Sequence, residues 1–372
     1  MRACTFEAAA AGIAWLRRHL RLMLPLTVAL AAGCQSLGPG SLPRDRLDYG
    51  GAIADSWREQ TLLNIVKLRY FDAPVFLEVS SVISSYTLQG EVNAQQRVSG
   101  TSPSSASNPI SSLGISGSYL DHPTITYTPV TGKKYIDSLL QPIPPQSIFA
   151  MIQGGHPADY ILGLSVEAIN GIHNYSTGPA RAPREDPAFN QVIGALRRIQ
   201  QAGALEIRTE KRDRQEAALI SFRPNVSPAV DQDIRLVRET LGISPQSTDL
   251  LLGFGATRRS GDQIALLTRS MLEILANLSS GVDVPKEHVA EGRATAAPQG
   301  DRAQRTFPMA HIRSSQERPP DAYAAVHYRD YWFWIDDRDL DSKRVFTFLM
   351  VFSSIAETGT VPQVPIITIP AN

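Results

Sequence analysis

Apolar and polar residues alternate along residues 82–94, the most regular pattern in the chain. The even-numbered positions include Val82, Leu88 and Val92, and the odd-numbered positions after Ile83 are polar. Successive side chains of a β-strand point to opposite faces of a sheet, so this pattern predicts a strand with one apolar face.

A second alternating run follows at Leu113–Tyr119 and resumes at Ile125 and Tyr127. Residues 99–112, between the two runs, are rich in Ser and Pro and lack charge, so they offer little for packing. Two amphipathic strands joined by such a tip predict a long projecting β-hairpin. Residues 75–83 also fit a helical spacing, which leaves strand and helix open for that segment.

Capping residues and helical periodicity predict helices elsewhere. Residues 52–70 have a broad apolar side. Asp186-Pro187 is a combination that often begins a helix, and a final helix is expected to begin near Asp339. Ser260–Gln263 has the form of a capping box, which predicts a helix with an apolar stripe from Ile264 to Leu278.

The helices and short strands interleave without a regular βαβ rhythm, so we expect an α+β fold of mixed helices and short antiparallel strands. Residues 160–172 fit either a strand or a helix. The proline-rich stretch Asn174–Pro187 indicates an interior linker. The predicted organisation is a signal peptide at 1–33, a flexible tether at 34–50, a helix and long hairpin region at 51–175, and an α+β domain at 186–372.

Three arginines, at positions 17, 18 and 21, precede an apolar run from Leu22 to Ala32. Charge, then a short apolar segment, then small residues is typical of a secretory signal. The eleven apolar-run residues would reach about 17 Å as a helix, well short of the roughly 30 Å hydrocarbon core. The pattern therefore predicts a cleaved signal and not a membrane-spanning helix.

The segment Leu30–Cys34 reads Leu-Ala-Ala-Gly-Cys and resembles the lipobox of bacterial lipoproteins, although Ala31 stands where Leu is commoner. The resemblance implies cleavage between Gly33 and Cys34, a diacylglyceryl group on the Cys34 thiol, and acylation of the new amine with a fatty chain such as palmitate. Gln35 stands where Asp would usually signal retention in the inner membrane, so the same resemblance implies the outer membrane and a periplasmic body. The alternative is an ordinary secreted protein cleaved near the same alanines.

Cysteine usage and charge fit this interpretation. Cys4 lies inside the predicted signal, so Cys34 has no partner for a disulfide in the remaining chain. The chain has 36 basic and 36 acidic residues, of which residues 1–33 contain four and one, so the remainder has a net charge near −3. That balance gives no electrostatic footprint for nucleic acid.

Asp337, Asp339 and Asp341 match the first three ligand positions of an EF-hand loop. The match then fails, because Ser342 replaces the turn glycine and Phe348 stands where a bidentate glutamate is required. We therefore expect the aspartates to cap the following helix.

The residues around this stretch show no catalytic or metal-binding signature. Residues 331–335 are expected to form a buried strand, and Glu287-His288 with Glu291 to be solvated at a loop edge. A deep cleft joining His327 with Asp336 and Asp337 would instead favour an enzyme. None of the histidines outside the signal has another His or Cys at helical spacing, so no metal site and no cofactor are predicted: His122, His156, His173, His288, His311 and His327.

Three further stretches resemble uncharacterised proteobacterial lipoproteins: Asn64–Tyr70, Pro123–Pro129 and Trp334–Arg344. This resemblance implies no activity and no site residues. We expect a binding or scaffold component of an envelope assembly, held on the bilayer by acylated Cys34, with envelope proteins or further copies of itself bound through residues 82–128. The alternatives are an oligomeric pore or secretion component built from hairpins, and an envelope enzyme with an unrecognised active site.

Overall fold

The computed structural model describes residues 42–83, 86–97, 110–121, 124–174, 186–212, 215–295 and 310–356. The predicted signal peptide, the hairpin tip and most of the predicted linker lie outside these residues. The chain divides into two compact units, Met1–Arg58 and Glu59–Asn372. Of the first unit, only the beginning of helix α2 is described.

Helix α2 (Leu42–Arg69) begins ten residues before its predicted start at residue 52. The prediction of a flexible tether over residues 34–50 is therefore wrong for its last nine residues. Pro43 lies in the first turn, where its missing N–H breaks no intrahelical hydrogen bond, so this proline is compatible with a helix. The apolar side predicted further along the helix is confirmed, since Leu62 and Val66 are fully buried.

A six-stranded sheet carries the main core of the described chain. Its order is β6-β5-β10-β9-β8-β7, and every neighbouring pair is antiparallel except β9 and β10. The predicted α+β class is confirmed. The strands are β5 (Val166–Ile169), β6 (Ile172–His173), β7 (Leu205–Arg212), β8 (Gln215–Phe222), β9 (Asp249–Phe254) and β10 (Gln263–Thr268).

The predicted boundary between the regions 51–175 and 186–372 runs through this sheet. Strands β5 and β6 precede it and β7 to β10 follow it, yet β5 pairs with β10. One cluster of buried apolar residues includes members from both sides. The prolines between them mark a connection within one structural unit and not a domain boundary.

Helices α4, α5 and α6 pack against strands of the sheet, and α7 packs against α6. The predicted start of α6 is confirmed, because the Asp186 side chain accepts a hydrogen bond from Ala188 N–H at 3.0 Å and Pro187 is the first helical residue. The helices are α3 (Gly132–Tyr135), the π-helical turn η2 (Ile136–Leu140), α4 (Pro145–Gln153), α5 (Ala158–Ser165), α6 (Pro187–Gln201) and α7 (Pro228–Leu241).

The single helix predicted after Ser260 is wrong. Its first part is strand β10, and helix α8 (Met271–Leu278) begins only after it. Strand β10 lies in the middle of the sheet with both faces covered, so its apolar run shows no alternation and resembles a buried helix. A capping box does begin α8, but Ser270 and Glu273 form it.

A second sheet has three antiparallel strands in the order β11-β13-β12. The buried strand predicted over residues 331–335 is confirmed, because Phe333 and Ile335 are fully buried. The helix expected near Asp339 is confirmed as α10. The elements of this region are η3 (Ser279–Gly281), α9 (Lys286–Ala290), β11 (Arg313–Ser315), β12 (Ala322–Tyr328), β13 (Tyr331–Asp336) and α10 (Leu340–Ala356).

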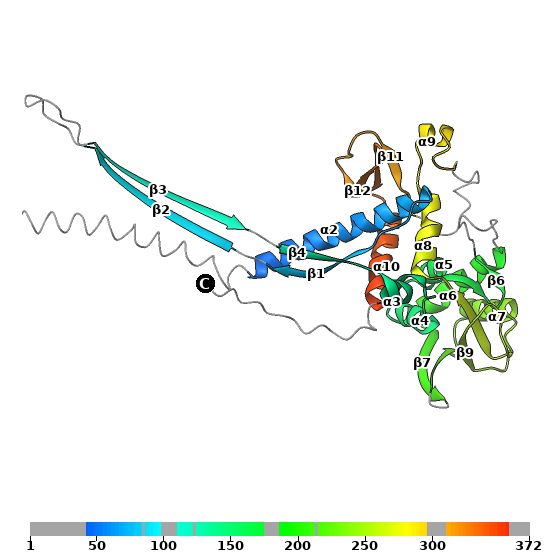
Figure 1. Cartoon of the computed structure of the whole chain (residues 1–372). Helices are drawn as coiled ribbons and strands as arrows, with labels where there is room; N and C mark the ends of the chain where they lie inside the picture. The colour runs from blue at the N-terminus through cyan, green and yellow to red at the C-terminus, as the bar shows by residue number, and fades with distance from the viewer. Residues whose placement is uncertain are drawn as a thin grey trace, which may run out of the picture. The chain divides into compact units, whose positions relative to one another are not determined.

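The predicted long hairpin is present as two ladders, the outer of which appears as a long ribbon in Figure 1. Strand β1 (Leu77–Ile83) pairs with β4 (Thr124–Pro129), and β2 (Tyr86–Arg97) pairs with β3 (Ile110–Asp121). The segment that fitted both helix and strand is therefore a strand. The pairs Ile83–Thr124 and Tyr86–Asp121 follow one register, so both ladders belong to a single hairpin.

Candidate functional site

The pairing register keeps the apolar positions of the hairpin on one face. In β4 the apolar residues Ile125 and Tyr127 occupy odd positions, whereas in β1 the apolar positions change from odd at Val79 to even at Val82. A bulge at Ser80 absorbs the change, since Val79 pairs with Tyr127 and Val82 pairs with Ile125. One extra residue reverses the face of every later residue in a strand, so the bulge preserves a continuous apolar face.

The same face continues along β2 and β3. The register pairs Leu88 with Tyr119 and Val92 with Ile115. We call these positions, together with Leu77, Val79, Val82, Ile125 and Tyr127, the apolar face of the hairpin. The positions of the opposite face are mainly polar: Gln89 pairs with Ser118, Glu91 with Ser116, Asn93 with Gly114 and Gln95 with Ser112.

Three residues of the apolar face are exposed at the base of the hairpin, and Val79 and Val82 are half-buried. The exposed fraction is 51% for Tyr127, 40% for Ile125 and 37% for Leu77. Among the described strands, no third strand joins either ladder. An isolated two-stranded ladder is marginally stable in water, and contiguous exposed apolar residues mark interaction sites. This face is the strongest candidate for a binding site in the described chain.

Two amide side chains of α2 hold the start of β1, and sequence reasoning missed them. Asn64 bonds both the N–H and the C=O of Val75, at 2.9 and 2.8 Å. Gln60 does the same for Leu77, at 2.9 and 3.0 Å. The two amides lie one helical turn apart. Together they bond the backbone of Val75 and Leu77 as a neighbouring strand would. The signal that could have found them is a polar Asn64 among buried apolar positions, with a second amide four residues earlier.

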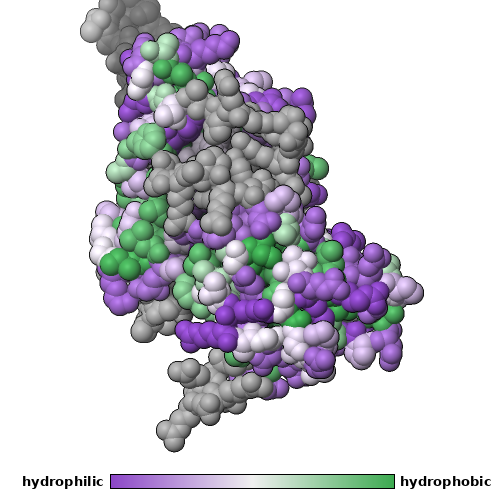
Figure 2. Space-filling view, turned by 90° about the vertical axis from the view of Figure 1, so that its right-hand side faces the viewer, coloured by the Kyte–Doolittle hydropathy of each residue, from purple (hydrophilic) through white to green (hydrophobic). Residues whose placement is uncertain are grey.

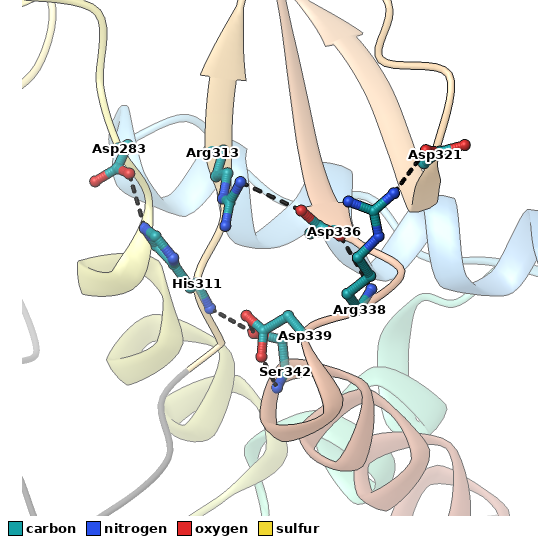
Figure 3. Close-up of polar contacts among 8 residues, drawn as sticks. All are labelled: Asp283, His311, Arg313, Asp321, Asp336, Arg338, Asp339 and Ser342. Carbon is teal, nitrogen blue, oxygen red and sulfur yellow. Dashed lines mark hydrogen bonds and ion pairs between the residues drawn. The ribbon is translucent and has the colours of Figure 1, made fainter.

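Of the aspartates after β13, Asp339 caps α10, as predicted (Figure 3). The Asp339 carboxylate accepts hydrogen bonds from the Ser342 N–H at 3.0 Å and from its hydroxyl at 2.7 Å. Asp337 pairs with Lys343 at 2.7 Å. Within the described residues, no group of three or more His, Cys, Asp or Glu side chains could hold a metal ion.

Serine, histidine and aspartate also lie close together beside this cap, but not as a catalytic triad (Figure 3). The buried Ser342 hydroxyl accepts a hydrogen bond from the backbone N–H of His311 at 2.7 Å. The His311 ring instead bonds Asp283 at 2.9 Å. A serine nucleophile needs its hydroxyl on the ring of the base, so this contact joins α10 to the chain before β11 and is structural.

His327 and Asp336, which would favour an enzyme if they shared a cleft, lie apart. His327 pairs with Trp332, whereas Asp336 pairs with Ala322 at the other end of the β12–β13 ladder. Asp336 forms an ion pair with Arg313 at 3.3 Å. The sheet therefore does not bring His327 and Asp336 into one site.

His288, which we expected to be solvated, is buried with an exposed fraction of 4%. Its Nδ1 lies 2.7 Å from the hydroxyl of Tyr70, and its ring packs edge-on against Tyr331. Burial raises the pKa of Tyr70 to about 12, because the phenolate would lose its hydration. The expectation fails because the short helix α9 packs against the end of α2 through this histidine.

Asp72 fixes the turn between β12 and β13 to the same end of α2. It accepts hydrogen bonds from the Tyr328 hydroxyl and from Arg329, the latter at 2.7 Å. Burial raises the pKa of Tyr328, and the hydrogen bond to Asp72 raises it further. Arg329 and Asp330 have φ values of +49° and +69°, which are unfavourable for residues other than glycine. The ion pair with Asp72 holds Arg329, one of these two residues, at the end of α2.

The predicted cleavage and lipidation residues, Gly33 and Cys34, lie outside the described residues. No helix of the described chain is long and apolar enough to cross a membrane. The face of the chain seen in Figure 2 carries small apolar patches separated by polar residues. Such scattered patches are ordinary on a protein surface and need no partner.

Comparisons with known protein families, with curated proteins and with solved structures found no match. No relative therefore supplies an activity or a set of site residues.

Proposed function

We propose that the protein is a lipid-anchored component of the bacterial outer membrane whose periplasmic body presents the hairpin to an envelope assembly. In this role it binds or scaffolds other molecules of the envelope. The single observation that supports the proposal is the base of the apolar face, where Leu77, Ile125 and Tyr127 stay exposed while most large apolar side chains of the two larger sheets are buried.

Acylated Cys34 is the anchor in this proposal. Each methylene buried in a bilayer contributes about 0.8 kcal/mol, so two or three acyl chains together hold a protein on a membrane firmly. Radioactive palmitate should label the wild-type protein and should not label the Cys34→Ala variant. An unlabelled wild-type protein, or a Cys34→Ala variant labelled as strongly as wild type, would refute the anchor.

The binding role depends on the apolar face and can be tested at neighbouring positions of β4. Ile125 lies on that face, and Thr126, also exposed, lies on the opposite one. A photoreactive amino acid placed at residue 125 in intact cells should form a discrete cross-linked product. The same amino acid at residue 126 should form much less of it. Equal products at the two positions, or none at either, would exclude a docking role for this face.

A further inference from the structure

We propose that hairpins from several copies of the chain pair edge to edge and close into a β-barrel that crosses the bilayer. The protein would then form a pore. This inference rests on the proposed lipid anchor, which would hold the copies on one membrane. It identifies the occupant of the hairpin edges as a second copy of this chain.

Strand length is the first support. Strands β2 and β3 have twelve residues each and pair over their whole length. A tilted strand needs about 9–11 residues to cross the hydrocarbon core, so this ladder is long enough to span it.

The division into two faces is the second support. A barrel strand in a membrane carries apolar residues toward lipid and polar residues toward the lumen. The register places Val92 and Ile115 on the apolar face at the middle of the ladder. The opposite face has Glu91, paired with Ser116, and Ser116 is exposed. In the barrel the apolar face contacts lipid and Glu91 contacts water in the pore.

The strand edges are the third support. Sheet edges in water-exposed proteins are commonly protected by lysine, proline or inward-pointing charge. Neither β2 nor β3 contains lysine or proline, and β3 has no charged residue between Ile110 and Leu120. The β3 edge therefore lacks the features that usually prevent strand addition, and the β2 edge has only the charges of Glu91 and Arg97.

Closure explains why the partner is another copy of the same chain. The two strands run in opposite directions, so the β2 edge of one copy meets the β3 edge of the next in antiparallel order. A two-fold dimer would still leave two open edges, whereas a ring leaves none. Every backbone polar group inside a bilayer must be bonded, so only the ring is compatible with insertion.

Single cysteines can identify which edges meet, because Cys34 is the only other cysteine expected in the anchored chain. One copy would carry Gln89→Cys on β2, and a differently tagged copy would carry Ser118→Cys on β3. The two would be co-expressed and treated with a short bifunctional thiol reagent. A ring predicts mixed β2–β3 products and higher oligomers in detergent. Products only between identical strands, or no product, would overturn the barrel.

Pore formation can be tested with adjacent substitutions on opposite faces. Val92→Asp places a charge on the apolar face, and Asn93→Asp places the same charge on the polar face. The purified lipidated protein would be added to dye-filled vesicles of phosphatidylethanolamine and phosphatidylglycerol. We expect dye release from wild type and Asn93→Asp, and loss of release with Val92→Asp. No release by wild type, or equal release by all three, would overturn the proposal.

These outcomes are distinct from failure of the proposed anchor. Palmitate labelling of wild type together with a single monomeric species in detergent would leave the anchored scaffold standing and reject the barrel. Loss of labelling would reject the anchor whatever the state of the hairpin.

Discussion

The body and the hairpin of this chain treat their apolar residues in opposite ways. By the body we mean the described chain outside β1 to β4. Its helices and its two larger sheets pack on one another, and large side chains such as Phe189, Phe333 and Phe346 are almost completely buried. In the hairpin, no third strand joins the ladders among the described strands, and Tyr127 and Ile125 of the apolar face remain exposed.

The body and the base of the hairpin are stabilised by different interactions. The body gains its stability from burial within one chain, which is the dominant favourable contribution to folding. The base of the hairpin is held to α2 mainly by directional hydrogen bonds from Asn64 and Gln60. Among the described residues no further strand joins the hairpin, and Ile125 and Tyr127 at its base stay exposed, which is why we assign function to its apolar face.

The largest expected effect contrasts two phenylalanines. Phe333 is fully buried in β13, and Phe254 is 57% exposed at the end of β9. We expect Phe333→Ala to lower the free energy of unfolding by about 3–5 kcal/mol, because it removes buried area and leaves a cavity. Phe254→Ala should change it by about 0.5 kcal/mol or less. Denaturant titrations followed by circular dichroism would measure both values, and similar losses would contradict the assignment of the core.

The next effect depends on pH and again separates body from hairpin. Burial raises the pKa of Tyr70 to about 12, above the ordinary value of 10.0, so the protonated phenol favours the folded state. The resulting stabilisation is present below pH 10 and is lost between about pH 10 and 12. At about 1.4 kcal/mol per pKa unit, the maximum loss is about 2–3 kcal/mol.

Unfolding measured across this range should show the extra loss in wild type and in Tyr127→Phe, a substitution in the hairpin. Tyr70→Phe should lack it. If the pH dependence of Tyr70→Phe matches that of wild type, other groups cause the loss and the proposed role of Tyr70 is wrong.

A smaller effect is expected at the cap of α10. Asp339→Ala removes the acceptor for the Ser342 N–H and should lower the free energy of unfolding by about 0.5–2 kcal/mol. Asp339→Asn keeps a side-chain oxygen and should recover most of the loss. Equal losses for Ala and Asn in thermal unfolding would indicate that charge, and not the hydrogen bond, is responsible.

Local signals in the sequence predicted the hairpin and the caps of α6 and α10, because each depends mainly on neighbouring residues, whereas the capping box expected at Ser260 was wrong. Asp186-Pro187 began α6 as expected, and Asp339 capped α10. Residues 75–83 could not be assigned for a physical reason. The bulge at Ser80 shifts the apolar positions from odd to even residue numbers. The resulting spacing of three residues between Val79 and Val82 is also typical of a helix.

The errors arose where distant parts of the chain decide the structure. Strand β10 reads as helix because it lies inside the sheet, paired with the distant strand β5, and consecutive residues on both of its faces are buried. The burial of His288 depends on Tyr70, 218 residues earlier. The clamp of Gln60 and Asn64 on β1 had a visible signal, but nothing in a single sequence indicates which backbone an amide will bond.

The smallest expected effect is the sharpest test of the comparison. Ile83 and Thr124 are paired, so a two-residue Asn-Gly turn can join them after residues 84–123 are removed. The shortened chain keeps β1, β4 and the amide contacts from α2. If the outer ladder takes no part in the stability of the body, the free energy of unfolding should stay within about 0.5 kcal/mol of the wild-type value.

The free energies of unfolding would be measured on shortened and unshortened chains that both lack residues 1–33, so that the lipid anchor does not influence unfolding. A matched chain, with residues 98–109 alone replaced by Asn-Gly, keeps both ladders and controls for the change of loop. A loss above about 1 kcal/mol in the first chain but not in the second would show that the outer ladder packs on the body. The outer ladder would then be part of the folded body, and its apolar face would no longer indicate an external partner.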